Sequence, residues 1–87
     1  KAIEINPKDA DAYDNRGVAK VEIKDTPGAL TDYNKAIELN PKHLNAYHNR
    51  GLSKINSGQK DSGCLDLSKA GELGDEKAYE LIKKHCN

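Results

Sequence analysis

Two six-residue segments that differ at one residue lie thirty-four positions apart in this chain of 87 residues. AYDNRG occupies positions 12–17, and AYHNRG occupies positions 46–51. The same shift aligns KAIEINP (1–7) with KAIELNP (35–41) and, less closely, with KAGELGD (69–75). Eleven of the 34 positions in 10–43 are identical in 44–77. A fixed period of this size indicates stacked copies of one supersecondary unit.

Apolar residues at helical spacing predict two helices in each unit. In the first unit they form two stripes: Ala12, Tyr13, Gly17, Val18 and Val21, then Ala29, Leu30, Tyr33, Ala36, Ile37 and Leu39. Thr26-Pro27 is expected to begin the second helix, with Thr26 as its N-cap, and Asn40-Pro41 to end it. In the second unit we expect helices at about 44–56 and 62–73, each followed by a glycine that ends it. Asp75 is expected to cap a last helix with one apolar face.

The pattern resembles the tetratricopeptide repeat, a helix–turn–helix unit of this length. The residues that carry the resemblance are Tyr13, Gly17, Ala29, Tyr33, Ala36 and Pro41 in the first unit, and Tyr47, Gly51, Leu67 and Ala70 in the second. Arg16, Lys20, Gly63 and Asp75 depart from the family's pattern. The resemblance implies an all-α, right-handed α-solenoid of antiparallel helix pairs with a C-terminal capping helix.

The domain organisation expected on this basis is a single domain over 1–87. Positions 1–9 are interpreted as the tail of a preceding repeat, 10–43 and 44–77 as two repeats, and 78–87 as the capping helix. Small residues should mark the places where the helices of a pair cross closely. Those residues are Gly17, Ala36, Gly51 and Ala70.

Composition and motifs argue against several function classes. Fourteen basic residues balance fourteen acidic ones, so we expect no nucleic-acid partner. The short apolar runs predict no membrane segment. No phosphate loop, zinc-type cysteine spacing or acidic calcium loop is present, so we expect no enzyme activity and no cofactor. His43, His48 and His85 are expected to be ordinary surface histidines that bind no metal. The compartment is not predicted.

Two readings of the cysteines are open. Cys64 lies early in the second helix of the second unit, and Cys86 ends the last helix. If these helices are antiparallel the two residues come near each other, so Cys64–Cys86 is a candidate disulfide. The simpler expectation is two separate small apolar side chains in a reducing compartment.

The candidate binding surface is the concave side that the first helix of each unit lines in solenoids of this kind. Asparagine amides there offer both a donor and an acceptor to a peptide backbone, and relatives of the family commonly use such an asparagine. Asn15 and Asn49 match that position, although both residues could instead serve the stacking of helices. The candidate peptide-binding residues are Asp11, Asp14, Asn15, Val18, Asn45, His48, Asn49 and Leu52.

The chemistry of this surface favours one class of ligand over another. One subgroup of the family grips C-terminal carboxylates with lysine and asparagine, but this chain has Asp14 and Val18 at those positions. We therefore expect a neutral or basic peptide segment. The leading function is a non-enzymatic module that binds a protein or peptide partner on this concave side. The alternative is a structural fragment of a longer solenoid that self-associates as a homodimer through its uncovered N-terminal end.

Overall fold

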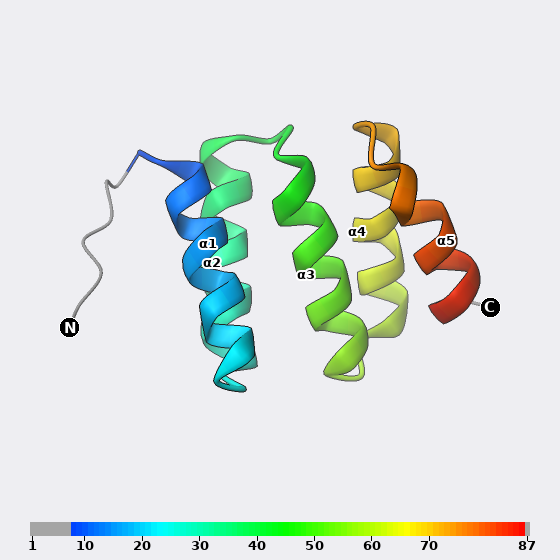
Figure 1. The fold of residues 1–87 in the computed structure, drawn as a ribbon, viewed down its shortest axis with the longest axis horizontal. Coiled ribbons are helices and arrows are strands. Elements are labelled where there is room, and N and C mark those ends of the chain that lie inside the picture. Colours follow the sequence, from blue (N-terminus) through cyan, green and yellow to red (C-terminus); the bar gives the residue numbers. More distant parts are fainter. Residues whose placement is uncertain (1–7, 87) are drawn as a thin grey trace.

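The computed structural model describes residues 8–86, and the described part of the chain contains five α-helices (Figure 1). Their bounds are α1 Ala10–Glu22, α2 Thr26–Leu39, α3 Leu44–Asn56, α4 Lys60–Glu72 and α5 Glu76–His85. Consecutive helices run antiparallel and are joined by short loops (Figure 1). The all-α solenoid of helix pairs with a C-terminal helix, expected from the sequence, is therefore confirmed.

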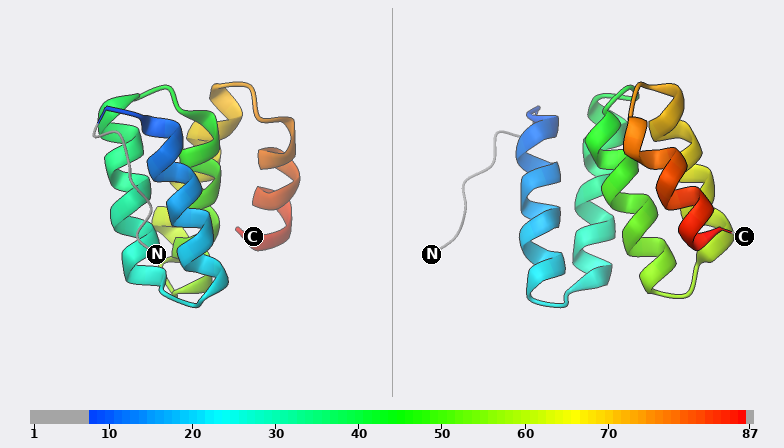
Figure 2. Two further views of the ribbon diagram at one scale, coloured as in Figure 1. Left: turned by 60° about the vertical axis from the view of Figure 1, so that its left-hand side comes forward. Right: turned by 45° about the vertical axis from the view of Figure 1, so that its right-hand side comes forward.

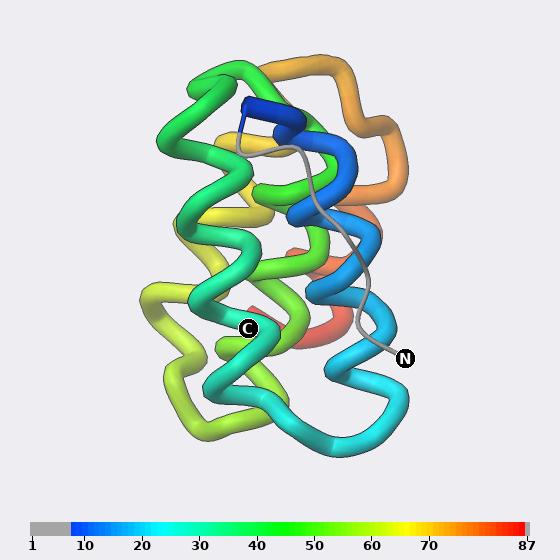
Figure 3. The backbone as a smooth tube through the Cα atoms, turned by 90° about the vertical axis from the view of Figure 1, so that its left-hand side faces the viewer, coloured from blue at the N-terminus to red at the C-terminus, as the bar shows by residue number. Residues whose placement is uncertain are grey.

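The helices form two layers. Seen along the stack, α2 and α4 lie on one side, while α1 and α5 lie on the other (Figure 3). The pairs α1–α2 and α3–α4 make the most extensive contacts, and α3 also packs on α1 and α2. Helix α5 packs on α4 at the end of the stack (Figure 2). We call the side formed by α1, α3 and α5 the inner face.

Most helices begin at a side-chain cap. Asp9, Asp25, His43 and Asp75 each accept a hydrogen bond from a backbone N–H in the first turn of the helix that follows. The cap of α2 is thus Asp25, which accepts from the Gly28 N–H at 3.0 Å, and the prediction of Thr26 was wrong by one residue. A carboxylate is a stronger acceptor than a hydroxyl, which favours the aspartate. Gly58 and Gly74 follow helix ends with φ of +90° and +114°, a conformation that glycine adopts without strain.

The two helix pairs cross closely at small residues, as expected. Ala36 and Ala70 are fully buried, and Gly17 lies against the ring of Tyr33. The helices of the second pair approach each other closely at Gly63. A Cβ atom built on Gly63 would lie only 2.5 Å from the backbone oxygen of Gly51. The equivalent residue in the first pair is Ala29, which follows the repeat pattern. Glycine replaces alanine at position 63 because the crossing there leaves no space for a methyl group.

A buried aspartate joins the two helices of each pair. Asp32 of α2 accepts two hydrogen bonds from Arg16 of α1, at 2.9 and 2.7 Å, and Lys20 lies 3.1 Å away. Asp66 of α4 repeats the arrangement with Arg50 at 2.8 and 2.7 Å and Lys54 at 3.2 Å. Each arginine also stacks over a tyrosine of its own helix, Tyr13 or Tyr47. This polar network explains why the two repeats have the same residue at three pairs of positions: Arg16 and Arg50, Lys20 and Lys54, and Asp32 and Asp66.

Helix α5 is built like α1 and α3, although it lies outside the thirty-four-residue register. Its sequence AYELIK begins at Ala78, thirty-two positions after Ala46, because α4 is one residue shorter than α2 and the loop before α5 is one residue shorter than the loop before α3. Ala78 is fully buried, as Ala46 is, and both lie three residues after the N-cap. The helix starts at Glu76, whereas the capping helix was expected over 78–87. The division of the chain into repeats stays a prediction, and positions 1–7 of its first segment lie outside the described residues.

Cys64 and Cys86 form a disulfide that ties the end of α5 to the first half of α4. Their Cα atoms are 6.0 Å apart. The antiparallel course of α4 and α5 brings the two residues together. The simpler expectation of two separate thiols does not describe this structure.

Candidate functional site

Among the described residues, three hollows on the inner face bear on the candidate site. The largest of these three, about 540 Å³, lies between α3 and the start of α5. A second of about 370 Å³ continues along the same two helices and shares His48 and Lys77 with the first. A third of about 210 Å³ lies between α1 and α3. The first two hollows make the interval between α3 and α5 a groove that runs along the helix axes.

Five of the eight candidate peptide-binding residues line these hollows. Asn45, His48 and Asn49 line the largest, His48 and Leu52 line the second, and Val18, Asn49 and Leu52 line the third. Leu52 therefore lies at the junction of the α1–α3 and α3–α5 intervals. Asp11, Asp14 and Asn15 line none of the three.

Two of the candidates link α3 to α1. The side-chain amide of Asn49 donates to the Asp14 carboxylate at 3.0 Å, and Asp14 is buried. This contact fits the alternative reading, in which asparagine serves the stacking of helices. The bond uses the side-chain nitrogen of Asn49 and not its oxygen. Asn15, the equivalent residue one repeat earlier, is exposed on α1.

Asp11 contacts the histidine that caps α3. His43 accepts from the Ala46 N–H through Nδ1 at 3.1 Å, so its Nε2–H donates to the Asp11 carboxylate at 2.7 Å. His43 is only 7% exposed, and the expectation of a surface histidine was wrong for this residue. The His43 ring accepts one hydrogen bond and donates another between α1 and α3, which explains its burial. Its position in a turn of the sequence does not predict these contacts.

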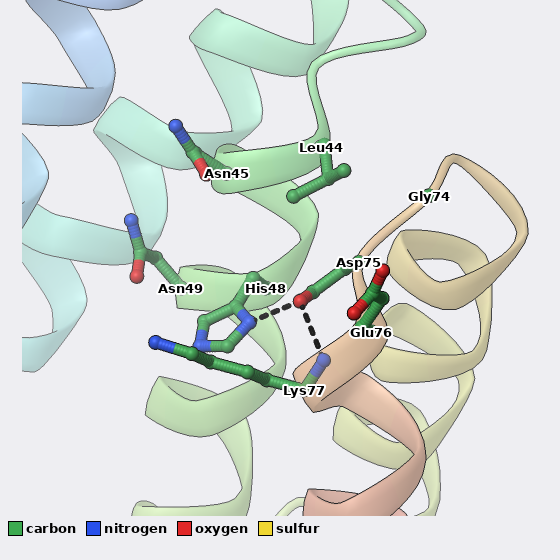
Figure 4. Close-up of a pocket in the computed structure, with 8 residues that line it drawn as sticks. All are labelled: Leu44, Asn45, His48, Asn49, Gly74, Asp75, Glu76 and Lys77. Atoms are coloured by element: carbon green, nitrogen blue, oxygen red, sulfur yellow. Dashed lines mark hydrogen bonds and ion pairs between the residues drawn. The ribbon is translucent and has the colours of Figure 1, made fainter.

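Figure 4 shows how His48 and Lys77 lie across the largest hollow. His48 of α3 contacts the Asp75 carboxylate through Nδ1, and Asp75 also caps α5 by accepting from the Lys77 N–H at 3.1 Å. The Lys77 side chain extends from α5 past His48 toward α3 (Figure 4). One buried aspartate thus fixes both the start of α5 and the His48 ring.

Sequence reasoning missed the contribution of α5 to the site. Lys77, Glu80, Leu81 and Lys84 line the second hollow. The signal was present in the Ala78-Tyr79 pair, which repeats Ala12-Tyr13 and Ala46-Tyr47 at a spacing of thirty-two rather than thirty-four. A search at one fixed period aligns α5 with the wrong residues of α3.

Charge is distributed unevenly along the inner face. Glu22 is the one charged residue among those that line the α1–α3 hollow, while two lysines and one glutamate line the second α3–α5 hollow. Tyr33, at the base of the α1–α3 hollow, is a neutral phenol at neutral pH, and burial raises its pKa further, to about 12. The α1–α3 hollow is therefore acidic and the second α3–α5 hollow is basic, while Asp75 and Glu76 accompany Lys77 at the first α3–α5 hollow.

Other kinds of site were sought in the described residues. Within 8–86 no cluster of three or more His, Cys, Asp or Glu side chains is placed to hold a metal ion. The same part of the chain contains no helix that is long and apolar enough to span a membrane.

Comparison with known families places the fold. Residues 19–58, which run from α1 through α2 to the end of α3, match the model described as TPR repeat. The match covers 40 of the 87 residues, and this part of the chain is similar to a tetratricopeptide repeat. No curated protein matches the chain. Repeats of this family generally serve protein–protein interaction.

Proposed function

We propose that the protein binds an extended peptide segment of a partner protein on its inner face. The observation that carries the proposal is the run of hollows over α1, α3 and α5, with Leu52 at their junction. Extended segments need backbone partners as well as apolar contacts. Asn45 and Asn49 line the first hollow, and Asn49 also lines the α1–α3 hollow together with Leu52. Helices fixed by buried Asp32 and Asp66 hold these groups on a rigid support.

A matched pair of leucine substitutions tests this proposal. Leu52 lies on the inner face, whereas Leu65 of α4 is 73% exposed and lines none of the three hollows. A library of random twelve-residue peptides is selected against the wild-type protein, against Leu52→Asp and against Leu65→Asp. We expect the wild-type protein and Leu65→Asp to enrich the same sequences and Leu52→Asp to enrich none of them. Equal enrichment by Leu52→Asp, with its helix content intact, would refute the proposal.

A second candidate function is self-association through the N-terminal end of the stack. It is supported by the difference between Asn49, which bonds to the neighbouring first helix, and Asn15, whose equivalent side chain is exposed. We propose that a second copy covers this side of α1. Light scattering over a dilution series should then show a dimer that dissociates on dilution and that Asn15→Asp weakens. A monomer at all concentrations rules this function out.

A further inference from the structure

The groove between α3 and α5 combines an apolar floor with a basic rim. Leu52 of α3 and Leu81 of α5 form the floor of the second hollow, and His48, Lys77 and Lys84 surround it with Glu80. At about 370 Å³ the hollow is large enough to take one apolar side chain.

The two lysines are not engaged in the fold. Lys20 and Lys54 pair with buried aspartates, and Lys35 pairs with Glu38. Within residues 8–86, by contrast, no ion pair or hydrogen bond involves the ammonium groups of Lys77 and Lys84. Lys77 also lies in the first turn of α5, where the helix dipole disfavours a cation. Its charge therefore does not serve the stability of its own helix.

The acidic residues that had suggested a basic ligand are used elsewhere. Asp14 is buried against Asn49, Asp11 accepts from His43, and Asp75 contacts His48. Glu80 alone opposes the two lysines on the second hollow. The charged residues that line the second hollow therefore have a net positive charge, whereas Asp75, Glu76 and Lys77 line the first hollow.

We propose that this groove selects acidic segments: an apolar side chain rests on Leu52 and Leu81, and flanking carboxylates meet Lys77 and Lys84. This inference rests on the proposed peptide-binding function and names the class of peptide. The two lysines are two helical turns apart, which separates their Cα atoms by about 10 Å along α5. Residues three apart in a polyproline II segment lie on one side about 9 Å apart. The favoured ligand thus carries two acidic residues three positions apart with an apolar residue beside them.

Charge reversal on α5 tests the inference within the same peptide selection. The variant Lys77→Glu/Lys84→Glu is compared with Lys69→Glu, which changes an exposed lysine of α4 that lines none of the hollows. The wild-type protein and Lys69→Glu should enrich peptides with paired acidic residues, and the double variant should lose this preference. A resynthesised acidic peptide should bind the double variant roughly fivefold to tenfold more weakly, and added salt should reduce the difference.

The outcomes separate this inference from the function on which it rests. Enrichment of neutral or basic peptides that depends on Leu52 overturns the acidic preference and leaves the inner-face function standing. The absence of any enrichment that Leu52→Asp removes overturns both. Because Lys84→Glu places an acid near the end of α5, Lys77→Gln/Lys84→Gln serves as a second variant with less effect on folding. An unchanged affinity of the acidic peptide for this neutral variant also overturns the inference.

Discussion

Two buried aspartates, Asp32 and Asp66, each join the two helices of one pair. Each carboxylate lies under the first helix of its pair and receives an arginine fork and a lysine. Burial alone would raise the pKa of the Asp32 carboxyl, but the hydrogen bonds and charges of Arg16 and Lys20 outweigh burial and lower it. Because the folded state binds the proton of Asp32 less readily than the unfolded state, ionisation of Asp32 stabilises the fold.

The first prediction concerns acid stability. The stabilisation from Asp32 is fully present above the unfolded pKa, near 3.8, and is lost as the pH falls through the lower folded value. Asp32→Asn should lower the free energy of unfolding at neutral pH by about 1.5–3 kcal/mol. The variant should also show a weaker loss between pH 5 and pH 2 than the wild type. Urea unfolding at a series of pH values measures both effects, and Glu72→Gln, on the exposed side of α4, should change neither.

The second prediction concerns the histidine cap of α3. His43→Ala removes the acceptor for the Ala46 N–H and should cost about 1 kcal/mol of unfolding free energy. His43→Asn keeps a side-chain acceptor at the N-cap and should recover most of that loss, as measured by thermal unfolding. An equal loss in both variants would show that the contact with Asp11, rather than the cap, carries the stabilisation.

Close helix crossings set the structure at the scale of elements. At the α3–α4 crossing Gly63 lies against the backbone of Gly51. At the α1–α2 crossing the Tyr33 side chain lies between the helices, and the buried residue equivalent to Gly63 is Ala29. Leu67 occupies the position equivalent to Tyr33 and is smaller, which lets the second pair close further. Gly63 and Leu67 therefore both contribute to the close packing of α3 on α4.

The third prediction compares two glycines of α4. Gly63→Ala places a methyl group against backbone and should lower the unfolding free energy by about 1–3 kcal/mol, despite the higher helix propensity of alanine. For Gly71→Ala the three nearest heavy atoms all belong to the phenol of Tyr79, whose side chain is exposed and free to shift. The Gly71 variant should be close to neutral or slightly stabilising in the same denaturant titration. Similar losses at the two sites would contradict the crossing argument.

The fourth prediction concerns the disulfide at the end of α5. The bridge spans a separation of 22 residues, so its loss should cost about 3 kcal/mol of unfolding free energy if its effect is entropic. Hydrogen exchange with and without reductant should show faster exchange in α5 after reduction, because α5 packs mainly on α4. Helix α1 should be affected much less. Equal acceleration in both helices would mean that α5 unfolds only with the whole chain.

At the scale of the whole molecule, much of the architecture could be predicted from the repeat. The identities at Tyr13/47 and Gly17/51 predicted the helix pairs, because packing repeats wherever the fold repeats. The partners of Arg16 and Lys20 could not be predicted, since their contacts lie in the second helix and depend on three-dimensional register. Helix α5 does not follow the fixed period because α4 and the loop after it are each one residue shorter than α2 and its loop, which shifts the alignment of α5 with α3. Lys77, Leu81 and Lys84 were missed for that reason.

The most direct test of the central claim is a map of backbone amide shifts in the isotope-labelled protein during titration with a selected peptide. If the inner face binds the peptide, amide signals should shift in α3 around Asn49 and Leu52 and in α5 around Leu81. Signals of α2 around Thr31 and of α4 around Leu65 should stay in place. Shifts confined to α2 and α4, or absent at Leu52 under saturating peptide, would contradict the account.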